Sequence, residues 1–183
     1  MRSPLNLPSG QDSDATLVKS IDTQFLIGSG LVAGYSVVNK FGRNDDVDTG
    51  SVPEAIWNGG GFYTGFPVGA AEEFQVFSSS ASDTGVLYFD YLASYTSTEY
   101  QTGSVTLNGV TVVNTGITGV RMNNARYECG TATTFNVGTI TLRHRTTTAN
   151  VFCVMPIGKS ITNVCAYTIP YDSIGFIERL IGS

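Results

Sequence analysis

The sequence predicts an all-β fold, an antiparallel β-sandwich of the jelly-roll type. The chain has 21 glycines, and threonine, valine and tyrosine recur throughout it, which is typical of strands separated by many turns. Short apolar runs bounded by Gly, Asn or Pro follow one another at roughly ten-residue spacing, which would supply about seven to nine strands. One run alternates strictly between apolar and polar residues, as a half-buried strand does.

The chain is expected to form one domain preceded by an extended arm. Residues 1–15 are polar and contain two prolines, which favours an extended N-terminal arm over a packed element. Residues 16–183 have the length of one ordinary domain, and no internal repeat or clean linker divides them. Within this β-sandwich domain we expect a strand over residues 31–38 and then a long loop over residues 39–67.

The loop over residues 39–67 is expected to contain a short helical turn. Ser51 and Glu54 have the spacing of a capping box, and the glycine-rich run 58–61 would end the turn. For the aromatic residues of this loop two interpretations stay open: they pack as a local core, or they anchor a partner chain, since Trp and Tyr are favoured at interface hot spots. These candidate interface residues are Trp57, Phe62, Tyr63 and Phe66.

Further strands are expected after this loop. Residues 74–78 and 85–94 form two apolar runs separated by a Ser-rich turn. Asn108-Gly109 predicts a type I′ hairpin between strands over residues 104–107 and 110–113, because both turn positions must adopt positive φ. A tail that could be strand or short helix ends the chain. The four remaining runs cover residues 120–130, 136–147, 150–158 and 161–170.

The alternating run places Ile140, Leu142 and His144 on one face of a strand. His144 is the single histidine, and no Gly-x-Ser-x-Gly nucleophile motif accompanies it. We therefore expect His144 to be a hydrogen-bonded histidine inside the sandwich rather than a member of a catalytic triad.

The charge balance argues against a nucleic-acid partner. Fifteen acidic residues exceed ten basic ones, for a net charge of −5, whereas binding to nucleic acid needs a basic face. Charged residues make up only 14% of the chain, which is typical of a protein that buries much surface in its core or against partners. No segment has the apolar length of a membrane span or the core of a signal peptide, so no membrane partner is expected.

A partial phosphate-binding motif fails on spacing. Residues 158–160 read Gly-Lys-Ser, the end of such a loop, but the glycine needed five positions earlier is Cys153. The segment that follows is strand-like, whereas the motif must open a helix. We expect a plain turn over residues 156–159 instead.

The acidic cluster of the long loop does not match a known metal motif. Asp45, Asp46 and Asp48 lack the glycine and glutamate positions of an EF-hand loop. An irregular calcium site stays open, as does a hydrolase that uses these acids with Glu54. The favoured interpretation is that they form turns and face water, so we expect no metal, no cofactor and no catalytic residue.

The cysteine pattern predicts free thiols. Cys129, Cys153 and Cys165 are odd in number and well separated, and free Cys is among the most buried residue types. Folding in a reducing cytosol accounts for this most simply. One Cys153–Cys165 bridge between adjacent strands stays open.

Several segments of the sequence, and the order in which they occur, resemble a group of tailed-bacteriophage virion proteins. The shared features are a loop with Gly-Arg-Asn, acidic residues, Glu-x-x-Trp, a Gly run, Tyr and Pro, then an Asp-Thr-Gly turn and a Leu-Asn-Gly hairpin. An Asn-Val-Gly strand start and a Tyr-Thr-Ile-Pro segment follow, so the resemblance extends from Asn39 to Pro170. It implies a structural virion component of the capsid decoration (cement) type, without enzymatic activity.

The resemblance also implies partners and a location. The chain would fold in the host cytoplasm, bind the major capsid protein and copies of itself, and stabilise the head of the virion. The alternative is a neck, tail or head-fibre component that binds host glycans through exposed aromatic side chains. The arm over residues 1–15 could reach over a neighbouring subunit. After residue 170 the chain offers fewer strands than the group suggests, so either the last strands are shorter or a partner chain completes the sheet.

Overall fold

The chain divides into two compact units, Met1–Asn39 and Lys40–Ser183. The predicted arm over residues 1–15 lies outside the part of the chain that the structure describes. The computed structural model describes residues 26–45, 47, 54–66, 68–130, 135–175 and 177.

The described part of the first unit turns instead of extending. A short helical turn closes where the Leu31 amide donates to the Leu26 carbonyl at 2.9 Å. Gly30 and Gly34 then have φ of +74° and +82°, in the left-handed region that glycine tolerates best. The strand predicted over residues 31–38 is therefore wrong, because the backbone bends at these glycines and joins no ladder.

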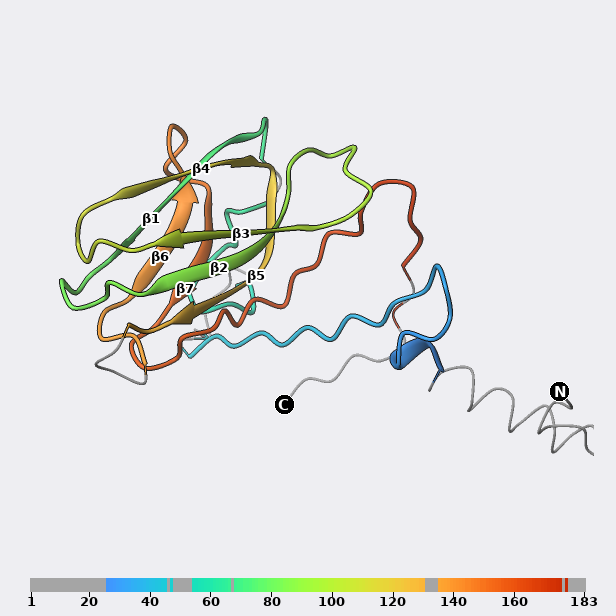
Figure 1. Cartoon of the computed structure of the whole chain (residues 1–183), viewed down its shortest axis with the longest axis horizontal. Coiled ribbons are helices and arrows are strands. Elements are labelled where there is room, and N and C mark those ends of the chain that lie inside the picture. The colour runs from blue at the N-terminus through green and yellow to red at the C-terminus, as the bar shows by residue number, and fades with distance from the viewer. Residues whose placement is uncertain are drawn as a thin grey trace, which may run out of the picture. The chain divides into compact units, whose positions relative to one another are not determined.

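The described residues of the second unit form two antiparallel sheets (Figure 1). The order is β4-β1-β6-β7 in one sheet and β3-β2-β5 in the other, which confirms the all-β prediction. Seven described strands are one fewer than the eight of a jelly roll, so that finer detail stays a prediction. The strands are β1 (Glu72–Ser78), β2 (Val86–Leu92), β3 (Gln101–Thr106), β4 (Val113–Gly119), β5 (Arg121–Glu128), β6 (Ile140–His144) and β7 (Val151–Met155).

One apolar core is shared by both sheets, as in a sandwich. Phe74 of β1 packs edge to face against Phe152 of β7 and against Phe89 of β2, with ring centroids 5.2 Å and 5.7 Å apart. Because β1 and β2 belong to different sheets, the Phe74 ring joins the two layers. Aromatic pairs of this geometry stabilise a core beyond the area that they bury.

The alternation predicted for β6 is confirmed. Ile140, Leu142 and His144 are wholly buried, and the residues between them are partly exposed. The His144 Nε2 donates to the Gly119 carbonyl at 2.9 Å, and Nδ1 accepts from the side-chain amide of Asn150 at 3.2 Å. Both ring nitrogens are therefore satisfied, and the histidine is part of the core.

The hairpin predicted at Asn108-Gly109 is wrong, because β3 and β4 lie in different sheets. A turn is present, but it is shifted by one residue: the Thr111 amide donates to the Asn108 carbonyl at 3.0 Å. Gly109, with φ of +56°, instead docks on the preceding loop. Its amide donates to the Asp83 carbonyl at 3.0 Å, and its carbonyl accepts from the Ser78 amide at 2.9 Å. These long-range bonds route the chain from one sheet to the other.

The segment after β7 covers the outer edge of β5. The Tyr127 amide donates to the Ser160 carbonyl at 2.8 Å, and the Thr162 amide donates to the Ala125 carbonyl at 2.9 Å. The strand predicted over residues 161–170 is reduced to isolated bridges. Because this segment pairs with β5, part of the chain itself occupies the sheet edge, which otherwise invites pairing with another chain.

The turn predicted over residues 156–159 is confirmed. The Lys159 amide donates to the Pro156 carbonyl at 3.2 Å, and Gly158 has φ of +75°. The following residues form β-bridges rather than a helix, so the Gly-Lys-Ser sequence lacks the helix that a phosphate-binding loop opens.

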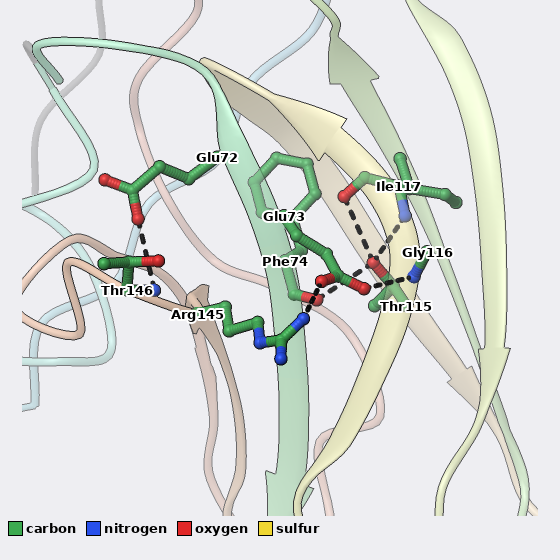
Figure 2. Close-up of polar contacts among 8 residues, drawn as sticks. All are labelled: Glu72, Glu73, Phe74, Thr115, Gly116, Ile117, Arg145 and Thr146. Carbon is green, nitrogen blue, oxygen red and sulfur yellow. Dashed lines mark hydrogen bonds and ion pairs between the residues drawn. The ribbon is translucent and has the colours of Figure 1, made fainter.

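A polar cluster fixes the irregular pairing of β1 with β4 (Figure 2). The register shifts between Glu73 and Gln75. At this shift the Thr115 hydroxyl donates to the Phe74 carbonyl at 3.0 Å and accepts from the Ile117 amide at 3.1 Å. The side chain thereby replaces ladder bonds that the irregularity removes.

Two adjacent carboxylates complete this cluster. Glu73 accepts from the Gly116 amide at 2.9 Å and from Arg145 Nη1 at 2.6 Å. Glu72 accepts from the amides of Thr146 and Thr147, at 3.2 Å and 2.8 Å. The bond from Arg145 lowers the pKa of Glu73, and the bonds from Thr147 lower the pKa of Glu72.

We expect acid to destabilise the protein partly through these two groups. Because their folded-state pKa values are lowered, their contribution is present above the ordinary value of 4.5 and is lost as the pH falls through the lowered values. The Glu73→Gln variant should show a smaller loss of unfolding free energy on acidification, measured by urea denaturation. In Arg145→Gln, the NMR titration midpoint of Glu73 should rise, and an unchanged midpoint would contradict the assignment.

Candidate interaction site around Arg121

The second half of the predicted long loop is extended and turned, without the predicted helix. The capping residue Ser51 lies outside the described residues, and Glu54 accepts from the Asn44 side chain at 2.8 Å. Trp57 forms an isolated β-bridge with Val164. The helical turn predicted here is therefore wrong, because the backbone pairs with a distant segment instead of with itself.

The glycine run wraps around the Trp57 indole. Trp57 Nε1 donates to the carbonyls of Gly60 and Gly61 at 2.9 Å and 3.3 Å, and both glycines have positive φ, +66° and +57°. A Cβ on Gly59 would lie 2.2 Å from the indole. Trp57 is 4% exposed and packs edge to face on Tyr63 at 5.1 Å, so it shapes the loop from inside.

Arg121, the first residue of β5, lies at the centre of the site. Its side chain is 2% exposed. The guanidinium carbon lies 4.6 Å from the ring centroid of Phe66 and 5.5 Å from that of Tyr63, within cation–π range of both. Nη1 donates to the Gly65 carbonyl and Nε donates to the Thr168 hydroxyl at 2.6 Å. One side chain thus connects β5, the aromatic loop and the C-terminal segment.

Two tyrosine hydroxyls make further contacts around this site: Tyr63 joins the aromatic loop to β7, and Tyr100, just before β3, joins the C-terminal segment. The Tyr63 hydroxyl donates to the Phe152 carbonyl at 3.3 Å, and the Tyr100 hydroxyl donates to the Thr168 carbonyl at 3.0 Å. Burial raises the pKa of both tyrosines to about 12, against the opposing effect of the Arg121 charge. Both hydroxyls therefore keep their protons and remain donors at neutral pH.

An open cleft of about 680 Å³ lies against this cluster. The cleft combines aromatic and aliphatic surface with one guanidinium and few other polar groups. Its walls include Tyr63, Phe66, Arg121, Tyr167, Thr168 and Ile169.

A second cation lies near this cleft. Lys40 Nζ donates to the Asn123 carbonyl. Burial lowers the pKa of Lys40, and the neighbouring Arg121 charge acts in the same direction. Cys165, which lines the cleft, and Asp90 oppose this shift. The cleft therefore has one cation in its lining, Arg121, with Lys40 nearby, and can stabilise an anion.

The acidic residues are not gathered at this cleft in the described structure. Asp45 is paired with Arg43 at the surface, and Asp46 and Asp48 lie outside the described residues. Within the described ranges, no three His, Cys, Asp or Glu side chains lie close enough together to hold a metal ion. The described part of the chain also contains no helix long and apolar enough to cross a membrane.

All three cysteines are free thiols, and the Cys153–Cys165 bridge is not formed. Cys153 is wholly buried in the core on β7, whereas Cys165 is exposed at the cleft. Burial raises the pKa of the Cys153 thiol, which makes it inert. The prediction that the free thiols are buried is confirmed for Cys153 and holds only in part for Cys129. It is wrong for Cys165, which is exposed.

The four aromatic residues chosen from the sequence divide into inner and outer members. Trp57 is buried and Tyr63 is partly buried, while Phe62 and Phe66 are 63% and 53% exposed. Sequence reasoning missed Arg121, which no motif or spacing marks. The sequence offers little signal, because β5 also contains Arg126 and Glu128, so charge does not single out Arg121.

We expect Gly59→Ala to destabilise the protein. Its Cβ would overlap the Trp57 indole, and overpacking of this kind costs about 1–3 kcal/mol. The matched control is Gly69→Ala, where a Cβ meets no atom within 4 Å. Thermal unfolding of both variants tests the packing: equal midpoints would show that the glycine run does not enclose the indole.

Comparison with protein-family models, with curated proteins and with solved structures finds no match to this chain.

Proposed function

We propose that the chain is a structural virion protein of a tailed bacteriophage, a capsid decoration protein that binds the major capsid protein and copies of itself. In this proposal the domain is a jelly-roll-like sandwich, located on the virion and without enzymatic activity. The ordered set of segments between Asn39 and Pro170 that resembles phage virion proteins supports it.

The observation that carries the proposal is the exposed apolar surface beside the cleft. Ile56, Phe62, Phe66 and Ile169 are all exposed, and they come from the loop and the C-terminal segment that Arg121 joins. A protein partner would bury exposed apolar side chains of this kind. These side chains stand on a backbone fixed by Trp57, so a partner would meet a preformed surface.

The charge of the chain supports a protein partner over nucleic acid. A net charge of −5 would repel a phosphate backbone, and only 14% of residues are charged. Aromatic side chains beside an arginine are typical of the well-packed centre of protein interfaces.

A binding experiment with emptied phage heads tests the proposal. The isolated chain should sediment with heads that lack it, and Phe62→Ser should weaken this binding by about tenfold, as loss of one apolar hot-spot residue does. Val110→Ser is the matched control: Val110 is also exposed, but its turn docks near Ser78, at the opposite end of β1 from the site.

Three results would contradict the proposal. One is a strict monomer in solution that does not bind heads. Another is retention on host cells that is lost when exposed tyrosines are substituted, which would favour the glycan-binding alternative. The third is turnover of polysaccharide that disappears in Asp45→Asn or Glu54→Gln, which would indicate a hydrolase.

A further inference from the structure

We propose that the cleft at Arg121 is a receptor for a carboxylate side chain presented by a partner protein. The nature of the partner rests on the proposed function, whereas the carboxylate chemistry rests on the cleft itself.

The Arg121 guanidinium is buried without an ion pair to any described carboxylate. Arg121 is 2% exposed. The other cation–π arginine on β5, Arg126, is exposed and paired with Glu128. A buried charge is costly unless it is paired, so a carboxylate that reached the Arg121 guanidinium would be stabilised.

The Arg121 guanidinium has more N–H donors than its protein acceptors use. A guanidinium has five N–H groups. The Gly65 carbonyl and the Thr168 hydroxyl accept two of these bonds, and the Tyr63 hydroxyl is a further neighbour. Donors remain on a group that lines the cleft, and a planar guanidinium fork suits a carboxylate.

A second cation, Lys40, interacts electrostatically with Arg121. Burial lowers the pKa of Lys40, the Arg121 charge acts in the same direction, and Cys165 and Asp90 oppose the shift. An incoming anion would attract both cations.

The cleft offers few hydrogen-bonding groups for a sugar. The Tyr63 hydroxyl already donates to the Phe152 carbonyl, and the Thr168 hydroxyl already accepts from Arg121. A saccharide, with a hydroxyl on most of its carbons, would find few free polar groups among these residues. A carboxylate on an apolar stem matches one cation set in apolar walls, and acidic protein side chains have this form.

NMR titration of the intact chain tests the inference directly. The probes are acetyl-Leu-Glu-amide and the matched acetyl-Leu-Gln-amide, which differ only in the charged group. The glutamate peptide should give saturable shifts of the Arg121 Nε–H and of the Thr168 amide. The glutamine peptide should bind about tenfold more weakly, because it cannot form charge-assisted bonds. Equal binding of the two peptides, or no saturable shift, would overturn the inference.

Variants separate the role of the cleft from the stability of the fold. Lys40→Gln should weaken binding of the glutamate peptide by about threefold while leaving the guanidinium in place. Arg121→Lys should weaken it by about tenfold, since lysine lacks the fork. Arg126→Gln, on the same strand, should bind the peptide normally. If Arg121→Lys fails to fold, the Lys40 variant and the two peptides still decide the outcome.

Two further arms identify the source of the carboxylate and separate this inference from the proposed function. Glucuronate that binds more tightly than the glutamate peptide would overturn the protein source in favour of an acidic sugar. Normal binding of Arg121→Lys to phage heads would overturn this role of the cleft while the decoration function stands. Binding of the glutamate peptide without binding to heads would support the carboxylate receptor and contradict the decoration function.

Discussion

The buried guanidinium of Arg121 is the contact on which the site depends. It connects the start of β5 to the Gly65 carbonyl in the aromatic loop and to the Thr168 hydroxyl in the C-terminal segment. Neither segment contains a described strand of its own, so neither is held by a full ladder. Because loops cost conformational entropy to fix, a charged residue with several directional donors is an effective way to hold two of them at once.

This arrangement relates the fold to its proposed role. The two sheets share a core centred on Phe74, and that core gives the loops a rigid support. On this support Trp57 and Tyr63 point inward, while Phe62 and Phe66 remain exposed. Sites built on a rigid scaffold need less ordering when a partner binds, which raises affinity for a given contact area. In a chain with a net charge of −5, one recessed cation would also restrict the choice of partner, because like charges in the wrong register repel.

Local patterns in the sequence predicted several strands of the two sheets, but they missed most of β4, gave false strands over residues 31–38 and 161–170, and predicted the connections poorly. The alternation of Ile140, Leu142 and His144 predicted β6, since a period of two depends only on neighbouring residues. Asn108-Gly109 failed as a hairpin because Gly109 makes its backbone bonds to residues far away in the sequence. The helix predicted around Trp57 failed for the same reason, because Trp57 pairs with Val164. The role of Arg121 depends on contacts with two distant segments. Contacts of this kind produce no periodic pattern in the sequence from which they could be predicted.

Hydrogen exchange in an Arg121→Lys variant tests the central claim most directly. If Arg121 holds the two segments, backbone amides in residues 55–66 and 162–169 should lose protection, while those of β2 and β3 keep theirs, because local opening then separates from global unfolding. Unchanged protection in both segments would contradict the account, and so would a uniform loss across the sheets, which would make Arg121 an ordinary part of the core.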